Sequence, residues 1–507
     1  MVFQTSRRDI IKLGAGAAAY SSLAKAADRP HISGYVRCHE SGRGLSGIRV
    51  SNGRDIVRTD ADGFYQMAVD EDDVIFVIKP RDYAPLLDDL MLPKLHAPAG
   101  VRNQDFFLVS EPEEESFDVL LIADPQPGNR EELGYLANLL ALMTQQKMPR
   151  FAITLGDLIG DQPQLYDAYN QLIAQLRVPI WNLPGNHDLD FSKSTPTAAR
   201  DIWRQLYGPG TRAFEYGSAL FITLDNIGHG PSEGSHYGYV GYVGADNLRF
   251  MESLLRDVPK DQLIVLAMHI PLVSSAPVED LSSRTHDHQA LLALLEGRNC
   301  ISLSGHMHSY EHHEVISAGG MAHQHHVLNA LCGSWWTGPF DPSGQPVAQS
   351  CDGTPNGWYI LSVQGTEARL KFQPARSSLP MRIMVGAGQG QSCTLLPQGI
   401  SCDELRQAKL LVNVFSGGHK TRVFCRLNGQ ELRWMSRIHD FDPSTQALFR
   451  AAGDNKKSWI EPVTSTHLWA TPLPQDLLPG IYRMDVEVYD GNKLSMRSVY
   501  FLDVLPG

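Results

Sequence analysis

Five short polar motifs in the middle of the chain carry residue types that hold metal ions in proteins. In chain order they are D-P-Q, G-D-L, G-N-H-D, M-H-I and G-H-M-H. Carboxylates, amide oxygens and imidazoles are the donors that divalent cations take in such sites. Each motif alone is common in turns and helix caps, so the indication comes from their occurrence together. The candidate ligands are Asp124, Gln126, Asp157, Asn186, His269, His306 and His308.

These residue types fit hydrolytic chemistry at two metal ions. Two cations about 3.5–4 Å apart share one bridging carboxylate, and each takes further oxygen or imidazole ligands. Asp157 is the natural bridge. His306 and His308 stand two positions apart, so in an extended segment their side chains diverge and each serves a different metal. Glycines precede Asp157, Asn186 and His306, and they allow the backbone to turn sharply there.

The motifs follow apolar runs that are typical of short buried strands. Between these runs, residues 131–143 and 164–176 have helical spacing. Strands that alternate with helices predict an α/β layered domain. Ligands gather at the carboxyl ends of strands in such sheets, so five distant strand ends can converge on one site. The runs are 117–122, 151–155, 179–183, 263–267 and 300–303.

Composition indicates a soluble globular protein of about three domains. The chain has 507 residues, of which 43 % are hydrophobic and 20 % charged, and its formal net charge is −12. This negative charge argues against a binder of nucleic-acid polymers, whose affinity comes from neutralising phosphates. It leaves room for a small phosphorylated substrate, because a bound metal dominates the local charge. The sequence predicts neither an oligomeric state nor a specific substrate.

Four segments follow from the patterns along the chain. Residues 1–27 are predicted as a signal peptide. Residues 28–112 read as strands and turns, predict a small β-sandwich, and resemble the carboxypeptidase-regulatory-like module. Residues 113–365 form the predicted catalytic domain, and the helix-poor residues 366–507 predict a C-terminal β-rich, sandwich-like domain.

The N-terminus carries a predicted export signal. Arg7 and Arg8 precede a short apolar segment over 13–23, and A-K-A at 24–26 has the pattern of a cleavage site. This resembles a Tat signal, and it implies recognition by the Tat machinery and a periplasmic or otherwise exported protein. The segment is too short for a membrane span of roughly 20 residues. The rest of the chain offers no transmembrane candidate.

Seven cysteines leave at least one thiol unpaired in a monomer. An exported protein can hold disulfides, for example Cys393–Cys402 or Cys332–Cys351. The spacing favours no particular pairing.

With these motifs in hand, residues 118–363 resemble the calcineurin-like metallophosphoesterase superfamily. Its pattern is D-x-H, a G-D motif, G-N-H-[DE], a lone His, and G-H-x-H. This chain has Gln126 where the usual histidine stands in the first motif. The flanking β regions resemble the dedicated N- and C-terminal domains of one bacterial branch. The resemblance implies a central αββα sandwich flanked by two β-sandwich-like domains.

The resemblance also implies roles for the candidate residues. A hydroxide that bridges two metal ions would attack the phosphorus of a phosphate mono- or diester. The catalytic residues would be His187, which contacts a phosphoryl or leaving oxygen, and Asp188, which orients His187. Asp161 would support the site or staple its loop. The first metal would take Asp124, Gln126, Asp157 and His308, and the second Asp157, Asn186, His269 and His306.

Gln126 is the one departure from the family pattern. A glutamine carbonyl is a neutral, hard oxygen donor, whereas imidazole suits zinc better. We therefore expect the first metal to bind less tightly than the second, with manganese or iron favoured and zinc possible. Gln126 is also the only motif residue that favours the alternative function, a catalytically weak binding or scaffold protein of the cell envelope.

Several further residues are open to two interpretations. Trp335 and Trp336 either wall a substrate pocket or are a core residue and its exposed neighbour. Asp352 and Asn356 either bind a substrate headgroup or belong to a turn. For the histidines of 323–326, we expect a strand with solvent-facing imidazoles rather than a third metal site.

Overall fold

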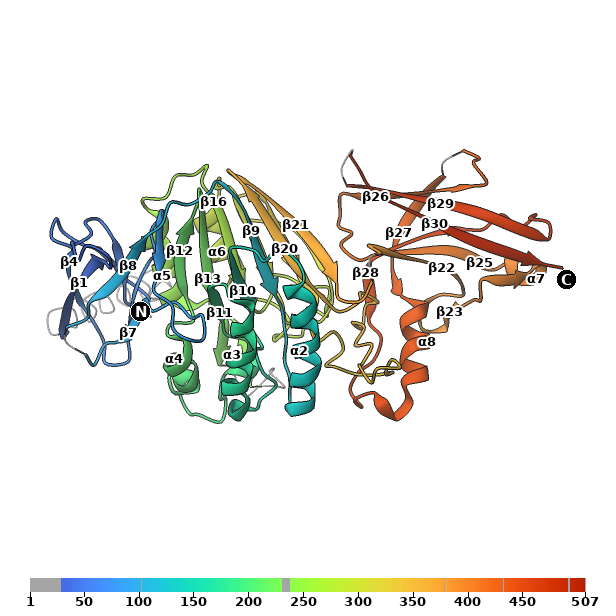
Figure 1. Cartoon of the computed structure of the whole chain (residues 1–507). Coiled ribbons are helices and arrows are strands. Elements are labelled where there is room, and N and C mark those ends of the chain that lie inside the picture. Colours follow the sequence, from blue (N-terminus) through green and yellow to red (C-terminus); the bar gives the residue numbers. More distant parts are fainter. Residues whose placement is uncertain are drawn as a thin grey trace, which may run out of the picture.

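The fold is known from a computed structural model, which describes residues 29–101, 103–229, 238–377, 379–431, 433–490 and 493–506. The predicted signal peptide lies outside the described residues. Three parts follow one another, from the N-terminal strands through the central sheets to the C-terminal sheet (Figure 1). The central part holds all five candidate motifs.

The N-terminal part is a β-sandwich. Within the described residues its strands form two sheets, in the orders β4-β1-β8-β6 and β3-β2-β5-β7. The strands are β1 (His31–Cys38), β2 (Arg49–Ser51), β3 (Ile56–Arg58), β4 (Phe64–Ala68), β5 (Val74–Val77), β6 (Tyr83–Pro85), β7 (His96–Pro98) and β8 (Phe106–Ser110).

This sandwich is fastened to the central part by backbone and by charge. The Glu215 N–H donates to the carbonyl of Lys79 at 2.8 Å. The buried Lys79 ammonium lies 2.5 Å from a Glu113 carboxylate oxygen, and it also donates to the Glu215 carbonyl. One apolar cluster runs from Ile32 and Val36 of the sandwich into the space between the central sheets.

The central part has two sheets that pack face to face, which confirms the predicted α/β class with an αββα sandwich. Among the described residues the strand orders are β11-β10-β9-β20-β21 and β12-β13-β16-β17-β19-β18, with a small β14-β15 ribbon beside them. The first sheet comprises β9 (Ser116–Ile122), β10 (Phe151–Leu155), β11 (Ile180–Leu183), β20 (Gly357–Gln364) and β21 (Glu367–Pro374). The second comprises β12 (Arg212–Tyr216), β13 (Ala219–Leu224), β16 (Leu263–Met268), β17 (Cys300–Ser304), β18 (Glu311–Ile316) and β19 (Ala322–Val327), and the ribbon β14 (Ile227–His229) and β15 (Tyr239–Gly241).

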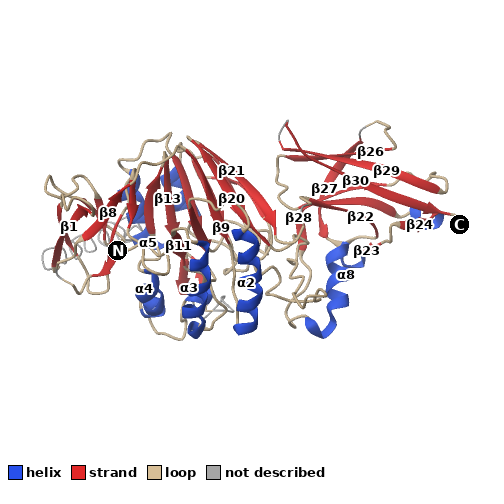
Figure 2. Ribbon diagram, viewed as in Figure 1, coloured by secondary structure: helices blue, strands red, loops and turns tan. Residues whose placement is uncertain are grey.

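Helices cover the outer face of each sheet (Figure 2). Leu133, Leu136 and Leu140 of α2 repeat at helical spacing and pack on the first sheet. The Asn129 side chain caps this helix by accepting the Glu132 N–H at 2.9 Å. The first sheet carries α2 (Arg130–Thr144), α3 (Tyr166–Ile173) and α4 (Asp201–Tyr207), and the second carries α5 (Gly244–Leu255) and α6 (His288–Leu295).

Parallel pairing brings the motifs together. Strands β9, β10 and β11 are parallel to one another, and so are β13, β16 and β17. Their carboxyl ends therefore meet at the same edge of the sandwich, and each candidate motif follows one of these ends.

The central sheet extends beyond the predicted domain boundary at residue 365. β20 pairs with β9, and β21 pairs with β20 from Glu367 to Pro374. By sheet membership the central part ends after Pro374. The C-terminal region therefore begins at the next strand.

The C-terminal part is one long sheet that bends at β27. Within the described residues its order is β23-β22-β25-β28-β27-β26-β29-β30-β24. β27 pairs with β26 near its start and with β28 along its end, so apolar residues of both halves share a core. Its elements are β22 (Met381–Ala387), β23 (Thr394–Leu395), β24 (Gly399–Ser401), α7 (Cys402–Leu405), β25 (Ala408–Val414), β26 (Thr421–Leu427), β27 (Arg433–Phe441), α8 (Pro443–Ala452), β28 (Thr464–Pro472), β29 (Gly480–Asp490) and β30 (Lys493–Leu505).

The expectation of solvent-facing imidazoles on residues 323–326 is wrong. β19 is an interior strand between β17 and β18, and His325 is fully buried. The Ser302 hydroxyl lies 2.7 Å from His323 Nε2 and 2.8 Å from His325 Nδ1. His326 stacks on His312 of β18, with ring centroids 3.9 Å apart. These histidines are therefore structural groups.

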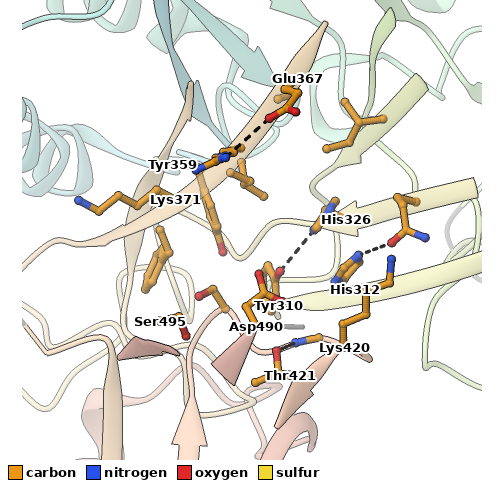
Figure 3. A pocket seen from close by; sticks show the side chains of 18 of the residues that line it. Tyr310, His312, His326, Tyr359, Glu367, Lys371, Lys420, Thr421, Asp490 and Ser495 are labelled. Atoms are coloured by element: carbon orange, nitrogen blue, oxygen red, sulfur yellow. Dashed lines mark hydrogen bonds and ion pairs between the residues drawn. The ribbon is translucent and has the colours of Figure 1, made fainter. Parts of the chain in front are cut away.

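A cavity of about 770 Å³ lies where the open edge of the central sheets meets the C-terminal part. Tyr310, His312 and His326 line it from the central side, and Lys420 and Thr421 from the C-terminal side (Figure 3). Among the residues that the structure describes, none of the seven candidate ligands lines this cavity.

All seven cysteines lie in the described part of the chain, and each is a free thiol there. The disulfides that export would permit are therefore not formed in this structure. Among the described helices, none combines the length and apolarity that crossing a bilayer requires.

Candidate metal centre

Six strand-end ligands converge at the edge of the sandwich. Asp157, His269 and His306 each offer a donor atom within 4.8 Å of the others. His269 Nε2 lies 3.3 Å from Asp157 Oδ2 and 3.0 Å from the Asn186 amide oxygen. His306 Nδ1 lies 3.2 Å from the same His269 nitrogen. This is the donor set expected for the second metal.

Hydrogen bonds to carbonyl groups orient both of these imidazoles. His269 Nδ1 donates to the Leu155 carbonyl at 2.7 Å, and His306 Nε2 donates to the Ser282 carbonyl at 3.1 Å. The other nitrogen of each neutral ring then carries a lone pair. These two nitrogens lie 3.2 Å apart, close enough to share one cation, either a proton or a metal ion. The donors therefore fit a metal ion.

Asp124 and His308 form the adjoining half of the site. Both Asp124 carboxylate oxygens accept the His306 backbone N–H at 3.0 Å. His308 Nδ1 lies 2.7 Å from the Gly333 carbonyl, which accepts its proton and leaves Nε2 facing Asp124 Oδ1 at 3.8 Å. Both side chains are buried. They are placed as the first metal requires.

Gln126 is held beside this half of the site. Its backbone N–H donates to the Asp157 carbonyl at 3.0 Å, which ties the first and second motifs together. Its side chain is buried, and the amide oxygen has no hydrogen-bond partner among the described residues. An unpaired buried carbonyl oxygen is costly, and a cation or its water would relieve that cost.

Close approach explains the glycine in three of the five motifs. A Cβ atom at Gly185 would lie 2.0 Å from Asp157 Oδ1, one at Gly156 2.5 Å from His269 Nδ1, and one at Gly305 2.4 Å from Asp124 Oδ2. The ligand residues themselves take up a strained backbone. Positive φ angles between 38° and 73° occur at Asp124, Gln126, Asp157, His306 and His308. Such strain persists where the surroundings enforce it, and it clusters at functional sites.

Burial and mutual charge perturb the ionisation of these groups. Burial, with the neighbouring charge of Asp157, raises the pKa of Asp124 to about 8. For Asp157 burial acts the same way, but the charges of His269 and His187 outweigh it and lower the pKa. Burial lowers the pKa of His306 to about 3 and that of His308 to about 4. Burial also lowers the pKa of His269, but the charge and hydrogen bond of Asp157 outweigh it and raise that pKa to about 9. Metal binding requires neutral imidazoles, so His306 and His308 are already in the required state, and a bound metal would displace a proton from His269.

His187 is partnered by Asp161, not by Asp188 as predicted. His187 Nδ1 lies 2.8 Å from Asp161 Oδ1, as an ion pair that lacks hydrogen-bond alignment. Burial lowers the pKa of His187, but the charges of Asp157 and Asp161 outweigh this and raise it to about 9. The side chain keeps 32 % exposure, so a cationic imidazole faces the open side of the site.

Asp188 holds the loop instead of orienting His187. Its carboxylate accepts the Gly185 N–H at 2.9 Å, the Leu158 N–H at 3.1 Å and the Tyr166 hydroxyl at 3.0 Å. These bonds fix the G-N-H-D loop against the loop that carries Asp157. The expectation was wrong because the turn after β11 directs Asp188 inward and His187 outward.

The paired tryptophans differ in role. Trp336 is buried, and its indole N–H donates to the Pro125 carbonyl at 2.9 Å, so it is a core residue that fixes the first motif. Trp335 is half-buried and stacks on His308, with ring centroids 3.9 Å apart and planes 16° from parallel. Trp335 therefore lies beside the metal centre.

Asp352 and Asn356 are placed as structural groups rather than substrate ligands. Asp352 is buried, and it accepts hydrogen bonds from the Tyr310 N–H at 2.8 Å and the Thr354 N–H at 2.9 Å. Asn356 is also buried, and its amide donates to the Leu331 carbonyl. Neither side chain faces solvent. A turn-like composition does not distinguish a surface turn from a covered one, and this turn is covered.

The groups that sequence reasoning missed are mainly backbone carbonyls. Leu155, Ser282 and Gly333 each accept a proton from a ligand histidine. A carbonyl is present in every residue, so it leaves no signal in the sequence. The pairing of Asp161 with His187 did leave a signal in the sequence, namely a second acid four residues after Asp157.

Three models of one protein family match successive parts of the chain. They are described as the N terminal of calcineurin-like phosphoesterase (residues 30–110), calcineurin-like phosphoesterase (117–310) and the C terminal of calcineurin-like phosphoesterase (325–493). A crystal structure of a dimetal phosphatase from Danio rerio is similar at 15 % identity and a TM-score of 0.35, over 52 % of this chain and 98 % of that one. No curated protein sequence matches the chain.

Proposed function

The chain belongs to the calcineurin-like phosphoesterases that carry dedicated N- and C-terminal domains, and we propose that it hydrolyses small phosphate mono- or diesters at two metal ions. One observation carries this proposal. Donor atoms of Asp157, His269 and His306 lie within 4.8 Å of one another, and the buried carboxylate of Asp124 faces His308 in the adjoining half of the site.

We assign two overlapping ligand sets. Asp157 is the shared ligand: its Oδ2 lies 3.3 Å from His269 Nε2, and its Oδ1 accepts the His187 backbone N–H at 2.9 Å. Two bound cations would supply Lewis acidity toward the phosphoryl group and a hydroxide nucleophile at neutral pH. The first set is Asp124, Gln126, Asp157 and His308, and the second is Asp157, Asn186, His269 and His306.

His187 is the proposed catalytic residue. Its cationic imidazole lies at the open side of the site, where it binds a phosphoryl oxygen or gives a proton to the leaving oxygen. Asp161 stabilises that charge, and Asp188 keeps the loop that carries His187 in register with Asp157. The negative charge of the substrate is thus met by one protein cation in addition to the metals.

Hydrolysis of p-nitrophenyl phosphate and bis-p-nitrophenyl phosphate with added Mn²⁺ tests the proposal and separates monoesterase from diesterase activity. We expect turnover of at least one ester, which Asp157→Asn abolishes. A protein that binds two Mn²⁺ ions but hydrolyses neither these esters nor a panel of nucleotides, sugar phosphates and phospholipid headgroups would support the scaffold alternative.

We also propose that the protein is exported through the Tat machinery and acts in the periplasm. The support is the twin arginine at Arg7 and Arg8 and the short apolar segment that follows. Replacement of both arginines by lysine should retain the protein in the cytoplasm in a fractionation experiment. Unchanged export of that variant would refute this assignment.

A further inference from the structure

We infer that the C-terminal domain positions His308, and that Thr466 and His467 of that domain thereby set the affinity of the first metal. The inference rests on the metal centre of the proposed function. It concerns how one ligand is held, through contacts that the structure shows directly.

The backbone that follows His308 is fastened to the C-terminal domain at Tyr310. The Tyr310 N–H donates to Asp352 Oδ2 at 2.8 Å, and the Tyr310 carbonyl accepts the Thr466 hydroxyl at 3.2 Å. Thr466 belongs to β28 of the C-terminal domain. Tyr310 stands only two residues beyond His308, so a shift at Tyr310 moves the ligand.

The Asp352 carboxylate is itself held from the C-terminal domain. His467 Nε2 lies 2.9 Å from Asp352 Oδ2, and its Nδ1 lies 2.7 Å from the Asn413 amide oxygen. The Asn413 amide nitrogen donates to Asp442 Oδ2 at 2.7 Å, which fixes the orientation of that amide. Burial raises the pKa of Asp352, but the bond and charge of His467 outweigh it and hold the pKa below its usual value. The side chains of Asp352, Asn413, Asp442 and His467 are all buried. Water therefore cannot easily take the place of a lost hydrogen-bond partner, and the loss carries a desolvation penalty.

The imidazole of His308 is also supported from the C-terminal domain. Trp335, which stacks on His308, packs in one apolar cluster with Phe449 and Ile460. Both of those residues belong to the C-terminal domain. The ring face and the backbone of this one ligand therefore depend on the same domain.

The other two ligand histidines are held differently. His269 donates to the Leu155 carbonyl and His306 to the Ser282 carbonyl, and both carbonyls belong to the central domain. A change in β28 should therefore weaken the first metal and spare the second. A general loss of protein stability would instead weaken both metal sites.

The test is a titration of the full chain with Mn²⁺, followed by electron paramagnetic resonance, for wild type, Thr466→Val and His467→Gln. Thr466→Val is isosteric and removes only the bond to Tyr310. The matched control is Thr471→Val, the same change farther along β28. In both test variants we expect the Mn²⁺ affinity of one metal site to fall about tenfold and that of the other site to stay unchanged. In Thr471→Val both affinities should equal those of the wild type.

Double variants with His308→Ala identify the affected site. If Thr466 acts through His308, Thr466→Val should cause no further change once His308 is gone. The inference is overturned if a folded Thr466→Val protein keeps both affinities, loses both equally, or adds its effect to that of His308→Ala. If His467→Gln fails to fold, the Thr466→Val result decides. A wild type that binds no Mn²⁺ would instead overturn the proposed function.

Discussion

Gln126 is the residue at which the metal site departs from imidazole and carboxylate ligands. Its side-chain oxygen is buried and unpaired among the described residues, and its backbone is strained with φ of 38°. The fold thus fixes the backbone of residue 126 beside the metal site, whichever side chain is present there. The identity of the residue then governs metal choice and affinity.

Gln126→His should tighten the first metal site by about tenfold or more and shift its preference toward Zn²⁺, because imidazole is a better donor to zinc than an amide oxygen. Competitive titration of wild type and variant with Mn²⁺ and Zn²⁺ measures both effects. Gln126→Asn, which keeps the amide but shortens the side chain, is the control. Equal Mn²⁺ affinities of the two sites in the wild type would show that glutamine is no handicap.

His187→Ala should lower kcat by about 10²–10⁴-fold, the usual loss when a proton donor in the transition state is removed. Its metal content should stay near that of the wild type, because only the backbone N–H of His187 contacts a ligand. Metal analysis and steady-state kinetics on one preparation separate the two quantities. A parallel loss of bound metal would make His187 a ligand.

At the scale of elements, the site depends on turns that leave no room for a side chain. Gly185 has φ of −103°, which any residue adopts. The position nevertheless excludes a Cβ atom, because Asp157 occupies that space. The constraint comes from packing between two strand ends.

Gly185→Ala should displace the Asp157 carboxylate, weaken both metal sites by at least about tenfold, and destabilise the fold by about 1–3 kcal/mol, the usual cost of overpacking. Gly134→Ala in α2 is the matched control, since its Cβ atom meets open space. That control should be neutral or stabilise by up to about 1 kcal/mol. Urea unfolding and Mn²⁺ titration measure the two outcomes, and an unaffected Gly185→Ala protein would contradict the geometry.

The buried histidines of β18 and β19 should make the fold sensitive to acid. Burial lowers the pKa of His312 and of His323 from 6.5 to about 4. Between those values the unfolded chain binds more protons than the folded one. The stabilising contribution of these histidines should therefore be fully present above about pH 6.5. The free energy of unfolding should fall as the pH drops from there toward 4, by about 1.4 kcal/mol for each histidine and each unit of its pKa shift.

Urea unfolding of the chelated protein between pH 4.5 and 8, as a series about half a unit apart, checks this dependence. His323→Gln should reduce the slope, because it removes one group that must take up a proton on unfolding. An equal slope in wild type and variant would show that His323 does not contribute.

At the scale of elements, the sequence patterns predicted where the strands end, but they did not predict which neighbouring elements bury a given side chain. Asp157, His269 and His306 follow apolar runs that form the parallel strands, so their convergence followed from the α/β pattern. The burial of His325 did not, because it depends on β19 being inserted between β17 and β18 in the sheet, an order that local composition does not reveal. The same limit affected Asp352, whose partners in the C-terminal domain lie far away in sequence.

At the scale of the whole molecule, the metal ligands come from strand ends of both central sheets, and the C-terminal part supports one of them through Tyr310 and Trp335. Metal binding should therefore stabilise more than the loops that provide the ligands. Removal of metal by chelation should lower Tm by a few degrees, because an ion present at 100 times its Kd stabilises by about 2.7 kcal/mol. Differential scanning calorimetry with and without Mn²⁺ measures this, and Asp157→Asn should show no shift.

The join between the N-terminal sandwich and the central part has a consequence for how such chains diversify. Lys79 and Glu113 neutralise each other in a buried position, and Ile32 and Phe117 belong to one apolar cluster. Suppose that the N-terminal segment were exchanged between relatives. A buried charge would then be left uncompensated unless Glu113 and the apolar residues that contact the segment were exchanged with it. Recombination at this join is therefore disfavoured, and the two segments are expected to be inherited as a single unit.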